Sequence, residues 1–81
     1  MTLYQFNMLD EMEQAEIVWS GAHIGERFDE EHSILLYQID LFYVEVYYNN
    51  EYNTISKLRS FSSIDQLAPY LGQIDIHKMV Q

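Results

Sequence analysis

The sequence predicts a two-layer α+β domain, in which a four-stranded antiparallel meander carries both helices on one face. Three observations favour this fold. An apolar stripe at helical spacing opens the chain, four short stretches rich in β-branched and aromatic residues follow, and a second helical pattern comes after them. The element order is therefore α-β-β-β-β-α, and strands joined by short turns pair antiparallel. The length, 81 residues, fits one domain spanning 1–81.

The first helix is expected over about residues 3–14. Thr2 and Gln5 have the spacing of a capping box, in which the two side chains bind free backbone amides at a helix start. An apolar stripe at intervals of four, four and three residues follows: Tyr4, Met8, Met12 and Ala15. Phe6 and Leu9 lie off this stripe and widen it, and the stripe predicts the side of the helix that faces the core.

The first strand is expected to begin near Ile17, where β-favouring residues start. Gly21 and Gly25 interrupt this stretch, so the strand should be bulged or strongly twisted. Residues 29–32 are polar and lie between apolar residues, which predicts a hairpin loop.

Residues 33–48 are apolar almost throughout, but one strand of that length is too long for so small a domain. A break is therefore expected at residues 39–41. A turn is expected at residues 48–51, because asparagine tolerates positive φ. The later strands are expected at 33–38, 42–48 and 54–61.

A second, short helix is expected after the sheet. Ser63 and Gln66 repeat the capping-box spacing, Pro69 lacks the amide that a longer helix needs, and Gly72 ends the pattern. The apolar residues among 74–80 are expected to dock onto the body of the domain.

The charge is strongly acidic, with 13 Asp and Glu against 4 Lys and Arg and a net charge of −9. Such a charge repels phosphate backbones and anionic lipid, so we expect no direct binding to nucleic acid and no membrane partner. The start of the chain lacks a basic segment, and the apolar runs are too short to span a bilayer, which favours a cytoplasmic protein. Lys57 and Arg59 alternate along the expected fourth strand and should protect its edge or balance nearby carboxylates.

The sequence favours no enzyme, no metal site and no cofactor. It contains no cysteine, its three glycines are scattered, and its serines lack the context of a catalytic nucleophile. The densest polar cluster, residues 29–32, ends in His32, but adjacent loop residues seldom point at one metal ion. So small a domain also has little volume for a buried substrate pocket.

The aromatic content of the sheet suggests an interaction face. Alternation along the expected third strand places Tyr43, Glu45 and Tyr47 on the face that the helices are expected to leave open, and Tyr37 could join them. Tyrosine combines apolar area with a polar tip and is enriched at protein interfaces. Cross-strand pairing that only stabilises the sheet is the other interpretation.

These features predict a non-enzymatic protein–protein interaction module whose partner is a second copy, giving a homodimer, or another protein that could be basic. The alternative is an acidic inhibitor of a basic target, either immunity- or antitoxin-like or a nucleic-acid mimic. A small-ligand binder that uses the aromatic face is a third, weaker hypothesis. The acidic face of the alternative would consist of Asp10, Glu11, Glu13, Glu16, Glu26, Asp29, Glu30 and Glu31.

Overall fold

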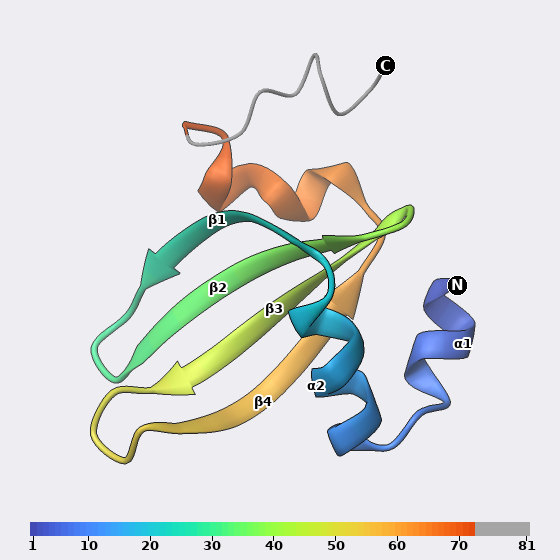
Figure 1. Cartoon of the computed structure of the whole chain (residues 1–81). Helices are drawn as coiled ribbons and strands as arrows, with labels where there is room; N and C mark the ends of the chain where they lie inside the picture. The colour runs from blue at the N-terminus through green and yellow to red at the C-terminus, as the bar shows by residue number, and fades with distance from the viewer. Residues whose placement is uncertain (73–81) are drawn as a thin grey trace.

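The computed structural model describes residues 1–72 (Figure 1). Its helices are α1 (Leu3–Asn7), α2 (Glu11–Trp19) and the 3₁₀ helix η1 (Ile64–Tyr70). Its strands are β1 (Ala22–Phe28), β2 (His32–Ile39), β3 (Phe42–Asn49) and β4 (Thr54–Phe61). The four strands pair antiparallel in the order β1-β2-β3-β4. This confirms the predicted α+β order and the meander, whereas the expected docking of residues 74–80 lies outside the described residues.

The N-terminal region contains two helices where one was expected over residues 3–14. The capping box of Thr2 and Gln5 is confirmed at the start of α1, but α1 ends at Asn7. A second capping box then starts α2, because Asp10 accepts a hydrogen bond from the Glu13 amide and the Glu13 side chain accepts one from the Asp10 amide. The chain therefore stops and restarts its helix within the predicted element.

The start predicted for the first strand is also wrong. Residues 17–19 belong to α2, and β1 begins only at Ala22. Val18 is fully buried in the core, so packing outweighs the β propensity of this stretch. The bulge expected in the first strand is confirmed between His23 and Gly25.

The remaining turns follow the sequence closely. The break predicted at residues 39–41 is confirmed, with Asp40 at a φ of 50° in the turn between β2 and β3. The turn before β4 lies about two residues later than predicted and contains Asn53 at a φ of 53°. Asp and Asn adopt this left-handed conformation more readily than other residues with a side chain.

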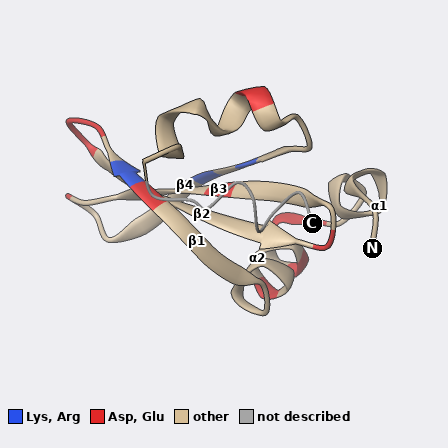
Figure 2. Cartoon of the chain, turned by 90° about the horizontal axis from the view of Figure 1, so that it is seen from above, with Lys and Arg blue, Asp and Glu red and all other residues tan. Residues whose placement is uncertain are grey.

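The sheet carries helices on both faces, which corrects the two-layer arrangement with both helices on one face. Phe42, Val44 and Val46 of β3 pack with residues of α1 and α2, whereas Tyr43 packs with η1 on the opposite face. Figure 2 shows η1 on one side of the sheet and α2 on the other. Leu67 gives η1 a buried apolar side of its own, so the chain crosses to the uncovered face after β4.

The core on the α2 face uses Phe6, which lies outside the predicted stripe. Phe6 is 1% exposed, and its ring centre lies 5.3 Å from that of Phe42. Tyr4, Met8 and Met12 are 74%, 70% and 75% exposed. The expected stripe is therefore not the core side, because the break between α1 and α2 changes which residues share a direction.

Gly21 allows a close approach where α2 leads into β1. A Cβ atom at this position would lie 2.9 Å from the backbone oxygen of Gln38 and would also collide with the Ile39 side chain. Only glycine permits this contact, so the end of α2 can lie directly on β2.

Candidate functional site

The residues expected to form an open interaction face do not form one. Tyr43 and Glu45 are buried beneath η1, and Tyr47 is half-buried beside them. Tyr37 lies on the opposite face, where its ring packs edge-on against Trp19 at 5.6 Å. The alternation of β3 was correct, but the expectation that this face is left open is wrong.

Glu45 is the centre of a buried polar network below η1. Its carboxylate accepts hydrogen bonds from Arg27 Nη2 at 3.1 Å, Arg59 Nη1 at 2.5 Å and the Tyr70 hydroxyl at 2.5 Å. Arg27 also donates to the Tyr47 hydroxyl at 3.0 Å. Two guanidinium groups thus neutralise a carboxylate that burial alone would penalise heavily.

The network explains where the basic residues lie. The Lys and Arg residues of the described part are Arg27, Lys57 and Arg59, and the register and their contacts place all three on the η1 face. The Lys57 ammonium lies 4.3 Å from the centre of the Tyr47 ring, a cation–π distance. Arg59 also donates to Gln66 of η1, so it joins the 3₁₀ helix to the sheet as well as balancing Glu45.

Tyr70 should give this network a pH signature. Burial and the hydrogen bond to Glu45 raise the pKa of Tyr70 well above its usual value of about 10. The neutral phenol is therefore favoured by folding, and its contribution is full below about pH 10 and is lost as the pH rises further. We expect the free energy of unfolding, measured in urea, to fall more steeply above pH 10 in the wild type than in Tyr70→Phe.

The control for this prediction is optical. Tyrosinate absorbs at 295 nm, so the difference between the titrations of wild type and Tyr70→Phe isolates the ionisation of Tyr70. An ionisation near pH 10 in the folded protein, with equal slopes of stability for both proteins, would show that the phenol is not held by Glu45.

The open apolar surface lies on the other face of the sheet. Figure 1 shows α1 and α2 over one half of that face, while the half that ends in the β1–β2 and β3–β4 turns carries no described helix. Paired residues share a face, and the register places Phe28, Ser33, Tyr48 and Ile55 in one row across the four strands. We define the open half-face by its apolar side chains: Met12, Phe28, Leu35, Tyr48, Ile55 and Leu58.

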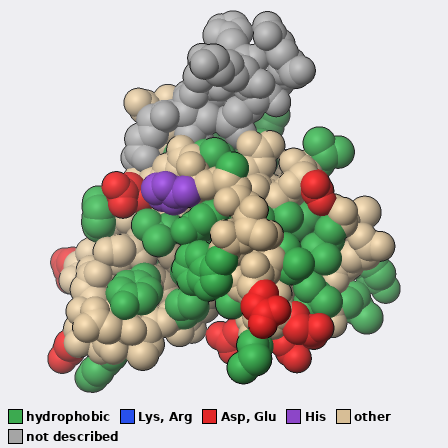
Figure 3. All heavy atoms as spheres, in the orientation of Figure 1, with side chains coloured by type: hydrophobic (Ala, Val, Ile, Leu, Met, Phe, Trp, Pro, Cys, Tyr) green, Lys and Arg blue, Asp and Glu red, His purple; other side chains and the backbone are tan. Residues whose placement is uncertain are grey.

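The open half-face has both a prominent side chain and a groove. Phe28 is 65% exposed, although it is the last residue of strand β1 and does not belong to a loop. A groove of about 390 Å³ runs between α2 and β4, lined by Met12, Ala15, Ile55 and Leu58, with Glu11 at its rim. Trp19 of α2 is half-exposed near Tyr37, and Figure 3 shows hydrophobic side chains across this side of the molecule. The surface can therefore accept an apolar partner group without rearrangement of the sheet.

Acidic residues surround the open half-face. Glu26 is the register partner of Leu35 and shares its face, and Glu16 lies at helical spacing between Met12 and Trp19. Figure 3 shows acidic side chains gathered at the start of α2, beside the hydrophobic ones. The structure thus places the predicted acidic residues in two groups and one single position: Asp10 at the N-cap of α2 with Glu11, Glu13 and Glu16 on the helix, Glu26 on β1, and Asp29, Glu30 and Glu31 in the hairpin loop.

The hairpin loop keeps its negative charge through local hydrogen bonds. The backbone amides of Glu31 and His32 donate to the Asp29 carboxylate at 2.9 and 2.6 Å, which lowers the pKa of Asp29. The Asp29 side chain thus stabilises the turn of its own loop, and the described residues contain no group of three or more side chains that could hold a metal ion.

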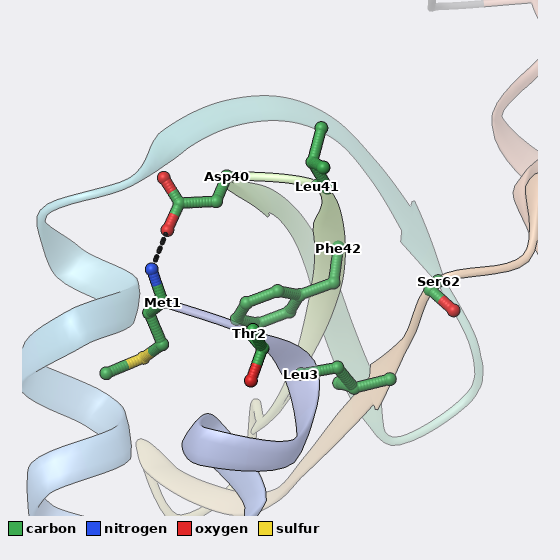
Figure 4. Close-up of a pocket in the computed structure, with 7 residues that line it drawn as sticks. All are labelled: Met1, Thr2, Leu3, Asp40, Leu41, Phe42 and Ser62. Atoms are coloured by element: carbon green, nitrogen blue, oxygen red, sulfur yellow. Dashed lines mark hydrogen bonds and ion pairs between the residues drawn. The ribbon is translucent and has the colours of Figure 1, made fainter.

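A second apolar hollow, of about 460 Å³, lies at the opposite end of the sheet (Figure 4). Its lining residues are Met1, Thr2, Leu3, Asp40, Leu41, Phe42 and Ser62. Figure 4 shows the Met1 amino group paired with Asp40, 2.7 Å apart, at one side of the hollow. Leu41 is 90% exposed, so it provides a useful control position away from the open half-face.

Comparison with known proteins adds no functional information. Within the described part of the chain, no helix is long and apolar enough to cross a membrane. No family model matches the chain, and no curated protein or solved structure matches it at a significant level.

Proposed function

We propose that this chain is a non-enzymatic protein–protein interaction module that binds another protein through the open half-face. The observation that carries the proposal is the exposure of Phe28 and Met12 on the open half-face, where a groove lined by Met12 runs between α2 and β4. Monomeric proteins seldom expose large contiguous apolar areas, and such areas mark interaction sites. A cytoplasmic location belongs to this proposal and rests on the sequence pattern.

Two further observations support it. Glu45, a carboxylate that acid–base chemistry would require free, is occupied by two arginines and Tyr70. A homodimer through Tyr43, Glu45 and Tyr47 would require η1 to leave the sheet, whereas the open half-face needs no such change. The aromatic interface predicted from the sequence is therefore proposed on the opposite face.

The experiment compares three proteins as baits in extracts of the cells that produce the chain. We expect the wild type and Leu41→Glu to capture the same partner, and Phe28→Glu to lose it, because a charge at this position opposes desolvation of the surface. Leu41→Glu is the matched control, since it places the same charge on an exposed apolar side chain at the other end of the sheet. Capture that survives Phe28→Glu would contradict the proposal.

A second measurement addresses self-association. Light scattering of the wild type should give the mass of a monomer at low and high salt. If the wild type is a dimer and Phe28→Glu is a monomer, the open half-face forms a homodimer. If both proteins are dimers, another surface forms the dimer.

A further inference from the structure

We infer that the partner segment is an amphipathic helix with an apolar stripe flanked by Lys or Arg, seated on the open half-face beside α2. This inference rests on the proposed function and specifies the chemistry of the partner. It is carried by the space on the sheet, the sign of the charges around that space, and the charge of the chain's own helices.

The space fits one helix. Strands of eight residues are about 26 Å long, and an α-helix with its side chains is about 10–12 Å wide. α2 packs over the half of the sheet where β2 ends and β3 begins, through Val18 against the cluster of Ile39 and Phe42. A second helix beside α2 would complete the layer, with its apolar stripe against Phe28, Leu35 and Tyr48 and its near side in the groove between α2 and β4.

The charges around this space select a basic partner. Glu11 and Glu16 lie on α2 at one border, Glu26 lies on the sheet, and the hairpin loop with Glu30 lies at the other border. Among residues 1–72, Arg27, Lys57 and Arg59 all lie on the opposite face, where Glu45 and aromatic rings engage them. A helix with cations on both flanks would therefore meet carboxylates on both sides of its apolar stripe.

A second copy cannot supply such a helix from the described residues. α2 contains three glutamates and no Lys or Arg, and α1 contains no charged residue. Two copies joined through this face would instead bring their acidic borders together, and like charges at an interface oppose association. The acidic surface predicted as an alternative function thus becomes the border of the apolar one.

The test uses three synthetic 18-residue peptides without tryptophan. All three carry the same leucine stripe, and their flanking positions are Lys, Gln or Glu. Trp19 is the only tryptophan of the chain and lies at the border of the site, so its fluorescence reports binding directly. We expect the Lys peptide to bind at least tenfold more tightly than the Gln peptide, and the Glu peptide to bind most weakly. Raising the salt from 50 to 300 mM should reduce the advantage of the Lys peptide.

Two variants and a control locate the site. Phe28→Ser should weaken the Lys peptide at least fivefold by removing apolar contact, and Glu16→Lys should weaken it by a similar factor. Asp65→Lys makes the same charge change at an exposed position of η1, on the opposite face, and should leave the affinity within twofold of the wild type. Two results would show non-specific attraction and overturn the inference. One is an affinity for the Lys peptide that Phe28→Ser leaves unchanged, and the other is an equal loss of affinity in Asp65→Lys and Glu16→Lys.

The other outcomes separate the inference from the proposed function. Equal binding of all three peptides, lost in Phe28→Ser, would leave the interaction surface intact and overturn the selection of a basic partner. Binding of no peptide, combined with Phe28-dependent capture of a cellular protein, would overturn the helical partner and leave the proposed function standing. Binding of no peptide, together with capture that does not depend on Phe28, would overturn both the inference and the proposed function.

Discussion

Replacing Glu45 with leucine is expected to lower the free energy of unfolding by about 3 kcal/mol. The change removes the shared acceptor of Arg27, Arg59 and Tyr70, and leaves two cations beside a new apolar group. The side chains of Arg27 and Arg59 are 32% and 44% exposed, so water can rehydrate them in part. This exposure places the loss at the low end of the range of about 3–5 kcal/mol for breaking a buried pair. For a domain of this size, the melting temperature should fall by roughly 12–24 °C.

Urea denaturation followed by the fluorescence of Trp19 measures this loss. Glu51→Leu is the matched control, because Glu51 is exposed in the β3–β4 turn, and its unfolding free energy should stay within about 0.5 kcal/mol of the wild type. If Glu45→Leu were as stable as Glu51→Leu, the network would contribute nothing to the stability of the domain.

The sequence predicted the sheet well because its signals are local. The alternation of apolar residues, the break at residues 39–41 and the bulge next to Gly25 all depend on signals within a few residues, whereas the turn predicted at residues 48–51 lies about two residues later, with Asn53 at positive φ. The capping box at Thr2 was equally visible. The second capping box, at Asp10, was also present in the sequence. The uninterrupted apolar stripe nevertheless favoured one continuous helix over residues 3–14.

The candidate site was harder to predict because it depends on which face each helix covers. Both faces of β3 are rich in apolar and aromatic residues, so period-two alternation tells which residues share a face and not which face is covered. The one readable signal was Glu45 itself, since a lone carboxylate in an apolar strand requires partners. Arg59 was present in the next strand, but only the register places it opposite Glu45.

The predicted acidic residues show the same difference between what the sequence reveals and what only the three-dimensional arrangement reveals. Their negative charge is evident from the sequence alone, and the structure adds that they border an apolar surface. Partner chemistry follows from this combination of apolar centre and acidic border, which neither feature predicts alone.

Phe6→Ala and Tyr4→Ala form a pair that distinguishes the two-helix arrangement from one continuous helix. Phe6 is fully enclosed against Phe42, so its removal leaves a cavity and is expected to lower the free energy of unfolding by about 3–4 kcal/mol. Tyr4 is largely exposed, and its removal should change the free energy of unfolding by no more than about 0.5 kcal/mol. Urea denaturation with Trp19 as the probe measures both.

The pair is informative because the apolar stripe from Tyr4 through Met8 to Met12 predicts the opposite order of effects. A continuous helix over residues 3–14 would turn Tyr4 to the core and make its loss the more costly one. In the structure, Asp10 ends that continuity by capping α2, and α1 is free to turn Phe6 inward. Asp10→Ala removes the N-cap of α2 and should lower the free energy of unfolding by about 1 kcal/mol. It should weaken the start of α2, and Phe6→Ala should still cost more stability than Tyr4→Ala in this background. A reversed order in the wild-type background would show that the periodicity, rather than the cap, decides which side of this segment is buried.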